Sequence, residues 1–203
     1  MSAFMDIGTG AGLAGATGVR PYLPPLLAGA LARGDVGIDF DGTDWRFLES
    51  TGFLAAVLAI GLVAYGIERA AAARPASDSP GRRRPGPAEI FGGIAGVVLA
   101  ALLFAGAMAD GGQADWVGIV FGPLCAALGW LAVGGLVERA RRRLDGGAAA
   151  LLTVYADGAA LLLAALAVFV PPLSFLALVG FAVLLLGGRR REGEKYAGLR
   201  ILR

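Results

Sequence analysis

Arg20 and Asp157 are the charged side chains that stand deepest inside the apolar stretches of this chain. Arg20 lies about midway along residues 9–32, and Asp157 lies at a similar depth along residues 147–169. An arginine at the centre of a bilayer costs about 2.5–3.5 kcal/mol on insertion scales, and a lone buried carboxylate takes up a proton instead of staying charged. An Arg20–Asp157 ion pair relieves both groups, so we expect them to meet. Such a pair either locks two helices together or opens to a substrate or a proton.

The backbone around Arg20 is unusual for an apolar segment. The stretch "GATGVRPYLPPLLAG", residues 15–29, contains Pro21, Pro24 and Pro25, which lack amide protons and clash with the preceding helical turn. Carbonyls that lose their partners cost several kcal/mol each in lipid, so this backbone should face protein or a wet cavity. One interpretation is a substrate-binding element, with free carbonyls for cations and a guanidinium for anions. The other is a proline-kinked helix whose arginine snorkels or pairs structurally.

The substrate-binding interpretation extends to residues near both charges. Tyr22 and Tyr155 each lie two residues from a charged side chain and could hydrogen-bond it. The predicted substrate-binding set is therefore Gly18, Arg20, Pro21, Tyr22, Pro24, Tyr155 and Asp157.

Two further acids occupy matching places. Glu68 and Glu138 end the second and fourth apolar stretches, and each is followed by an arginine. They are candidates for a gate, although pairing along the helix and snorkelling at the interface explain them as well.

Several site classes are excluded or disfavoured by residue content. The chain has no histidine and one cysteine, Cys125, so histidine-dependent hydrolysis, thiolate metal sites and disulfides are excluded. "GAGLAG" at 10–15 follows no strand and is not a nucleotide site. The acidic loop "GDVGIDFDGTDW" lacks EF-hand spacing, so a solvated loop is favoured over a weak divalent-cation site. No paired acid–base constellation is visible. We therefore expect no enzyme activity, no metal and no cofactor.

The elements that position these residues are predicted to be membrane helices. Of 203 residues, 57% are hydrophobic, and apolar stretches near 20 residues long recur. The fold class is all-α: a single integral membrane domain of six transmembrane helices arranged as three hairpins, the first helix broken by prolines. The expected spans are residues 9–32, 50–68, 89–109, 117–138, 147–169 and 171–188, followed by a tail at 189–203.

The distribution of basic residues predicts the orientation. Fifteen of the eighteen Lys and Arg residues lie in three segments: the linkers after the second and fourth spans, and the tail. The opposite side holds Arg33, Arg46 and seven acids. The positive-inside rule then places both termini in the cytoplasm. Contact with anionic lipid headgroups explains these basic segments better than nucleic acid, which we do not expect as a partner.

A weak internal repeat can be drawn. "LAAVLAIGLVAYGIERA" at 54–70 resembles "LCAALGWLAVGGLVERA" at 124–140, and "LAGALARG" resembles "FAGAMADG". This suggests a hairpin unit repeated over 9–70 and 89–140, with a third hairpin at 147–188. Similar composition of Ala- and Gly-rich helices explains the likeness equally well.

The stretch "GVRPYLPPLLAGALA" and the tail "PPLSFLALVGFAVLLLGGRRREGEKYAGLRILR" carry a resemblance that covers most of the chain. Together they resemble a bacterial multi-pass membrane family of unknown function, numbered forty-one twenty-six. The resemblance implies a protein of the bacterial inner membrane and no particular activity.

The residues predict passage of a small ion or solute, an anion in preference, through a channel or a carrier. The alternative is a membrane module that binds lipid or a partner protein without transport. Membrane lipids are expected partners, and the small-residue faces leave room for a homo-oligomer.

Overall fold

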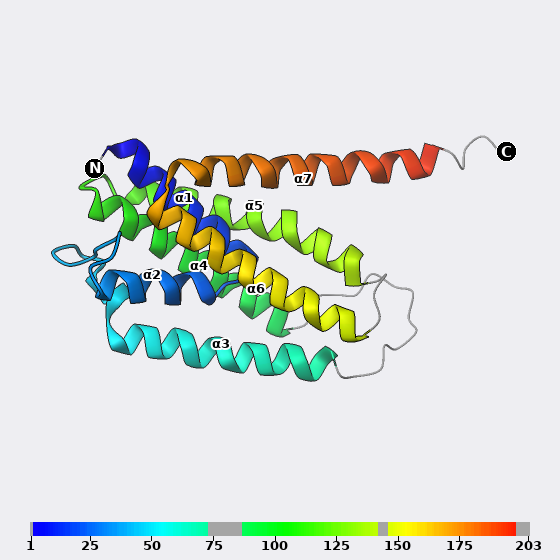
Figure 1. The fold of residues 1–203 in the computed structure, drawn as a ribbon, viewed down its shortest axis with the longest axis horizontal. Helices are drawn as coiled ribbons and strands as arrows, with labels where there is room; N and C mark the ends of the chain where they lie inside the picture. The colour runs from blue at the N-terminus through cyan, green and yellow to red at the C-terminus, as the bar shows by residue number, and fades with distance from the viewer. Residues whose placement is uncertain (1, 73–86, 142–145, 198–203) are drawn as a thin grey trace.

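The computed structural model describes residues 2–72, 87–141 and 146–197, and these ranges are all α-helical apart from short connections (Figure 1). The helices are α1 Ala3–Val19, α2 Leu23–Arg33, the short 3-10 helix η1 Arg46–Glu49, α3 Thr51–Ala72, α4 Pro87–Asp110, α5 Trp116–Arg141, α6 Gly146–Phe169 and α7 Pro172–Ala197. The prediction of an all-α fold is confirmed.

Within the described residues, three helices are long and apolar enough to cross a membrane. They contain the segments Phe91–Asp110, Trp116–Gly134 and Leu151–Phe169, of 20, 19 and 19 residues. Shorter apolar segments lie in α3 and α7, at Thr51–Ile67 and Pro172–Gly187. A helix rises 1.5 Å per residue, so each of the three longer segments covers about 30 Å of hydrocarbon. These helices indicate a multi-pass membrane protein.

The first apolar stretch is interrupted where the prolines predict it. α1 ends at Val19, and Arg20 adopts an extended conformation with φ −142° and ψ 107°, as expected for a residue that precedes a proline. α2 then begins at Leu23, with Pro24 and Pro25 in its first turn. The first amides of a helix have no partner within it, so prolines are tolerated there. The prolines therefore start a second helix and do not kink a continuous one.

The direction of α2 corrects the prediction of a single broken span over residues 9–32. α2 runs back beside α1, as Figure 1 shows, so the two helices form a re-entrant hairpin. Near its start, α1 lies at the Val170–Pro171 connection, because Gly8 faces the Pro171 carbonyl. At the other limb, Arg33 of α2 donates a hydrogen bond of 2.6 Å to Thr51 at the start of α3. The chain thus enters and leaves on the same side.

The tip of this hairpin lies at half the length of the bundle. Pro21 packs against Gly96 of α4, Tyr22 packs against Gly61 of α3, and Gly18 packs against Ala126 of α5. Each of these partners stands near the middle of its helix. The described chain therefore has five elongated helices and one half-depth hairpin, and the arrangement as three full hairpins is wrong in its first member.

The two ends of the bundle differ. We call the loop end the one that holds residues 34–50, 111–115 and 170–171, and the linker end the one where α3, α5 and α7 finish and α4 and α6 begin (Figure 1). α1 begins at the loop end, whereas α7 finishes at the linker end. The N-terminus and the end of α7 thus lie at opposite ends of the bundle. The prediction that both termini are cytoplasmic counted the first stretch as one complete crossing, and it stays a prediction.

The core lies in the half of the bundle that contains the hairpin. Leu13 of α1, Leu103 and Phe104 of α4, and Phe40 and Leu48 of the 34–50 segment are 0–2% exposed. Glycines permit this packing: a Cβ on Gly18 would collide with the Ala126 carbonyl, and one on Gly129 would collide with the carbonyl of Gly15. Small residues thus bring α1 and α5 into backbone contact, as is common between membrane helices.

The suggested repeat has a partial counterpart in the fold. α2 and α3 run in the same directions as α4 and α5 (Figure 1). Gly29 and Gly106, which correspond in the two similar stretches, both pack against Leu48. α2 has only 11 residues against 24 in α4, so the units differ in length, and an internal duplication stays a prediction.

Candidate functional site

Arg20 and Asp157 form an ion pair at the tip of the re-entrant hairpin. Arg20 Nε lies 2.5 Å from Asp157 Oδ1, and the two side chains are 19% and 31% exposed. Arg20 comes from the break between α1 and α2, and Asp157 comes from the middle of α6. The predicted contact is confirmed. Both charges are partly accessible, so the pair borders open space on at least one side.

The end of α1 also stabilises the positive charge. The Arg20 amide donates a hydrogen bond of 3.0 Å to the Ala16 carbonyl and closes the helix. The carbonyl end of a helix carries a partial negative charge, which favours a cation by about 0.3–1 kcal/mol at exposed sites. A helix terminus and a carboxylate therefore hold the guanidinium at half depth.

Most other residues of the predicted binding set pack within protein. Gly18 is buried against α5, and Pro24 is among the most completely buried side chains. Pro21 and Tyr22 contact Gly96 and Gly61 at the hairpin tip. These residues shape the tip, where Pro21 and Tyr22 stay partly exposed. Their role in binding a ligand stays a prediction.

Tyr155 does not join the group. Its side chain is 74% exposed, and residues two apart on a helix point in nearly opposite directions. Asp157 faces Arg20, so Tyr155 faces away from it. Helical geometry therefore separates Tyr155 from the ion pair, and its predicted role in substrate binding stays a prediction.

The two candidate gate acids lie on the expected helices. Glu68 is near the end of α3 and Glu138 is near the end of α5, both at the linker end. Their side chains lie outside the described residues, so their role as a gate stays a prediction.

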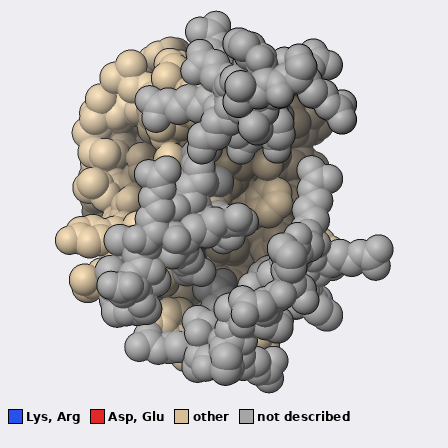
Figure 2. Space-filling view, turned by 90° about the vertical axis from the view of Figure 1, so that its right-hand side faces the viewer, with Lys and Arg blue, Asp and Glu red and all other residues tan. Residues whose placement is uncertain are grey.

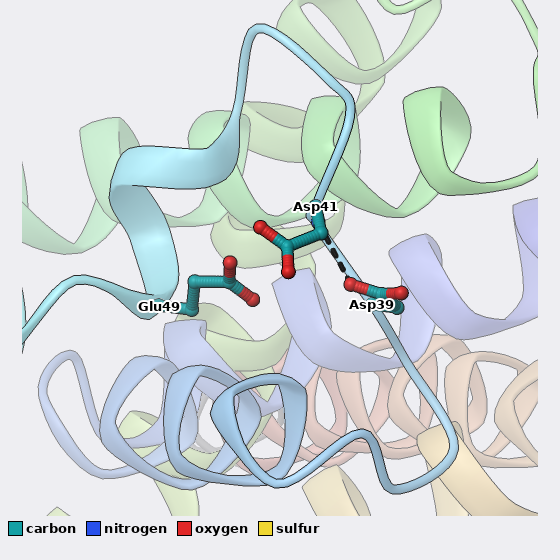
Figure 3. A group of neighbouring side chains, drawn as sticks. All are labelled: Asp39, Asp41 and Glu49. Carbon is teal, nitrogen blue, oxygen red and sulfur yellow. Dashed lines mark hydrogen bonds between the residues drawn. The ribbon is translucent and has the colours of Figure 1, made fainter.

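A second charged group stands at the loop end. The carboxylates of Asp39, Asp41 and Glu49 have oxygens within 4.8 Å of one another (Figure 3). Asp41 and Glu49 point toward each other in this view, and the Asp41 amide donates a hydrogen bond of 2.7 Å to Asp39 Oδ1. Arg46 balances part of the charge, with its Nε 2.9 Å from Asp41 Oδ1.

Crowding of carboxylates changes the titration of Glu49. Burial and the neighbouring Asp41 raise the pKa of the Glu49 carboxyl above its ordinary value of 4.5. Three carboxylates in this arrangement are the oxygen ligands that hard cations prefer. The sequence favoured a solvated loop here, and the Asp-x-Asp spacing at 39–41 was its one signal of the group.

Sequence reasoning also missed Asp6. This side chain is 3% exposed and lies against Gly111, and within the described residues its Oδ2 has no hydrogen-bond partner. An acid in the first turn suits a helix N-terminus, which compensates part of the burial cost. A lone Asp before a Gly-rich apolar helix was the available signal.

Comparison with known proteins adds no relative: no family model, no curated protein and no solved structure matches the chain. The resemblance to the bacterial family of unknown function therefore stays a prediction.

Proposed function

We propose that this protein passes a small ion or solute, an anion in preference, across the bacterial cytoplasmic membrane. The observation that carries the proposal is the partly exposed Arg20–Asp157 pair at the tip of a hairpin that ends at half depth. Helices broken at the bilayer midplane are a recurrent way to build ion and solute sites in membrane proteins. Charged side chains at that depth of a bilayer cost free energy of insertion, and they mark functional sites in membrane proteins.

The proposal assigns separate roles to the two charges. Arg20 provides the positive charge that attracts an anion, and its planar guanidinium suits oxyanions such as carboxylate or phosphate. Asp157 is the counter-charge when the site is empty and accepts a proton or yields to the anion when it is filled. Exchange of one anion for another at a fixed guanidinium avoids leaving the cation unpaired.

Orientation follows from the basic residues together with the re-entrant hairpin. Under the positive-inside rule the linker end faces the cytoplasm. Five helices would then cross the membrane, with the N-terminus outside and the C-terminus in the cytoplasm. This arrangement differs from one with both termini inside, because α1 begins and α2 finishes at the same end of the bundle.

A second candidate is a membrane module that binds lipid or a partner protein and transports nothing. The observation in its favour is the short, direct contact between Arg20 and Asp157. In this alternative the pair only fixes α6 to the hairpin tip, and function lies on the basic linker segments.

Flux through proteoliposomes separates the two candidates. Purified protein is reconstituted with gradients of chloride, nitrate, phosphate and small carboxylates, and Arg20→Ala and Asp157→Asn variants are compared with the parent. Arg46→Ala is the control, since Arg46 lies 74% exposed at the loop end. We expect anion flux that falls at least tenfold in Arg20→Ala and is unchanged in Arg46→Ala. Equal flux in folded Arg20→Ala and parent proteins rejects the assigned site.

A further inference from the structure

The short α2 leaves space below the hairpin tip. α2 lies between α3 and α6 over its 11 residues and contacts both. Beyond its start at Leu23, no other helix takes its place. Within the described residues, no Cα atom of α3 comes within 8 Å of α5, α6 or α7, and none of α4 comes within 8 Å of α6. The linker half of the bundle therefore lacks a central element.

Burial along the helices changes at the same level. On the linker side of the tip, none of the described residues is buried in α3 after Gly61, in α4 before Gly96, or in α6 before Ala160. On the loop side, α4 and α6 carry buried residues such as Ala100, Leu103, Ala160 and Ala164. The transition from buried to accessible side chains coincides with the Arg20–Asp157 pair.

Glycines of α4 show that the space is on the inner face. Gly96 faces the hairpin, because a Cβ there would lie 3.3 Å from Pro21. Gly92 is one turn closer to the linker end on the same face, and a Cβ there would meet nothing within 4 Å. The face of α4 that contacts the hairpin thus borders open space immediately beyond the tip.

Residues on the inner faces of α3 and α6 follow in the same way, from their spacing of one turn from a residue whose contact is known. Tyr65 is one turn beyond Gly61, which packs on Tyr22, and Thr153 is one turn before Asp157. A phenol and a hydroxyl therefore stand on the inner faces of α3 and α6, below the charged pair. In the view from the linker end, the described residues that can be seen are uncharged (Figure 2).

The loop end is closed at the corresponding position. Leu13, Phe40, Leu48, Leu103 and Phe104 fill the space around the hairpin and are at most 2% exposed. Access to Arg20 from that end would require α1 to separate from α5, with which Gly15 and Gly18 make backbone contact, and from α4, whose Phe104 ring packs on Gly10.

We propose that small anions reach Arg20 only from the linker end, through a water-filled chamber between α3, α4 and α6. This rests on the proposed function and adds the route and the side of entry. Fifteen of the eighteen basic residues lie in the last turns of α3, α5 and α7 or in the segments that follow these helices in the sequence. A concentration of positive charge at an entrance raises the local anion concentration. The structure thus corresponds to a state open to one side.

Cysteine accessibility tests the chamber. In a Cys125→Ala background, Thr153→Cys and Gly92→Cys place single thiols in it, and an anionic, membrane-impermeant sulfonate thiosulfonate reagent is added to either side of oriented vesicles. Tyr155→Cys, on the opposite face of α6, and Ala164→Cys, in the closed half, are controls. We expect both chamber thiols to react from the linker side at least tenfold faster than either control. A cationic reagent of similar size should react more slowly than the anionic one.

Outcomes for the chamber and for transport are separable. Chamber thiols that react no faster than Tyr155→Cys, or that react from the loop side, overturn the chamber, whatever the flux. Reaction from the linker side without any anion flux keeps the chamber and rejects transport. Folding of each variant is checked by size-exclusion chromatography, and either chamber thiol alone is sufficient for the measurement.

Discussion

The coupling between Arg20 and Asp157 can be measured by a double-mutant cycle. The variants are Arg20→Met, Asp157→Asn and the double substitution, which remove one charge, the other charge and both. The coupling free energy is the part of the destabilisation that the single variants share. If the pair fixes the hairpin tip to α6, the stability losses of the two single variants should add up to more than the loss in the double variant.

The expected magnitude follows from the exposure of the pair. Exposed ion pairs contribute about 0–1 kcal/mol, and breaking a fully buried pair by removing one partner costs about 3–5 kcal/mol. Side chains 19% and 31% exposed, with Nε and Oδ1 2.5 Å apart, lie between these limits. We expect a coupling of about 2 kcal/mol. This exceeds the average of about 0.6 kcal/mol for interhelical hydrogen bonds in a membrane protein.

The chain contains a matched control pair. Arg46 and Asp41 at the loop end are 74% and 58% exposed, with Nε and Oδ1 2.9 Å apart. Their coupling, measured with Arg46→Met and Asp41→Asn, should stay below about 1 kcal/mol. Both cycles are measured by equilibrium unfolding in mixed micelles with SDS as denaturant, followed by circular dichroism. Equal couplings for the two pairs would refute the assignment of Arg20–Asp157 as the contact that holds the tip.

Three further predictions concern packing, titration and orientation. Gly18→Ala should lower the melting temperature, because its Cβ meets the Ala126 carbonyl and overpacking costs about 1–3 kcal/mol; Gly158→Ala, with open space around it, should be neutral or raise it by the better helix propensity of alanine. The raised pKa of Glu49 means that the folded state holds this proton to higher pH than the unfolded state. Its contribution to stability is therefore present below pH 4.5 and lost as pH rises through the folded pKa. As pH rises through that window, the melting temperature of the parent should fall relative to that of Glu49→Gln. A difference between the two melting temperatures that does not change with pH would contradict this. Reporter tags on the two termini should lie on opposite sides of the membrane, whereas tags on one side would mean that the hairpin crosses it.

The sequence determined the class of the protein and the place of its central irregularity. Long apolar stretches predict membrane helices, because about 20 such residues match the hydrocarbon thickness. Pro21, Pro24 and Pro25 located the break, since an imino acid cannot continue the helical hydrogen bonds. The contact between Arg20 and Asp157 also followed from sequence, because each charge needs a partner at that depth.

Only the tertiary structure decided the path of the chain beyond that break. A proline states where a helix ends, but the direction of the next helix depends on which neighbours bury it. Gly18 against Ala126 and Tyr22 against Gly61 hold the tip at half depth, and contacts of α2 with α3 and α6 turn it back. The carboxylates of Asp39, Asp41 and Glu49 likewise meet only because the 34–50 segment folds over Phe40 and Leu48. These are packing relations between residues distant in sequence, and local residue patterns do not encode them.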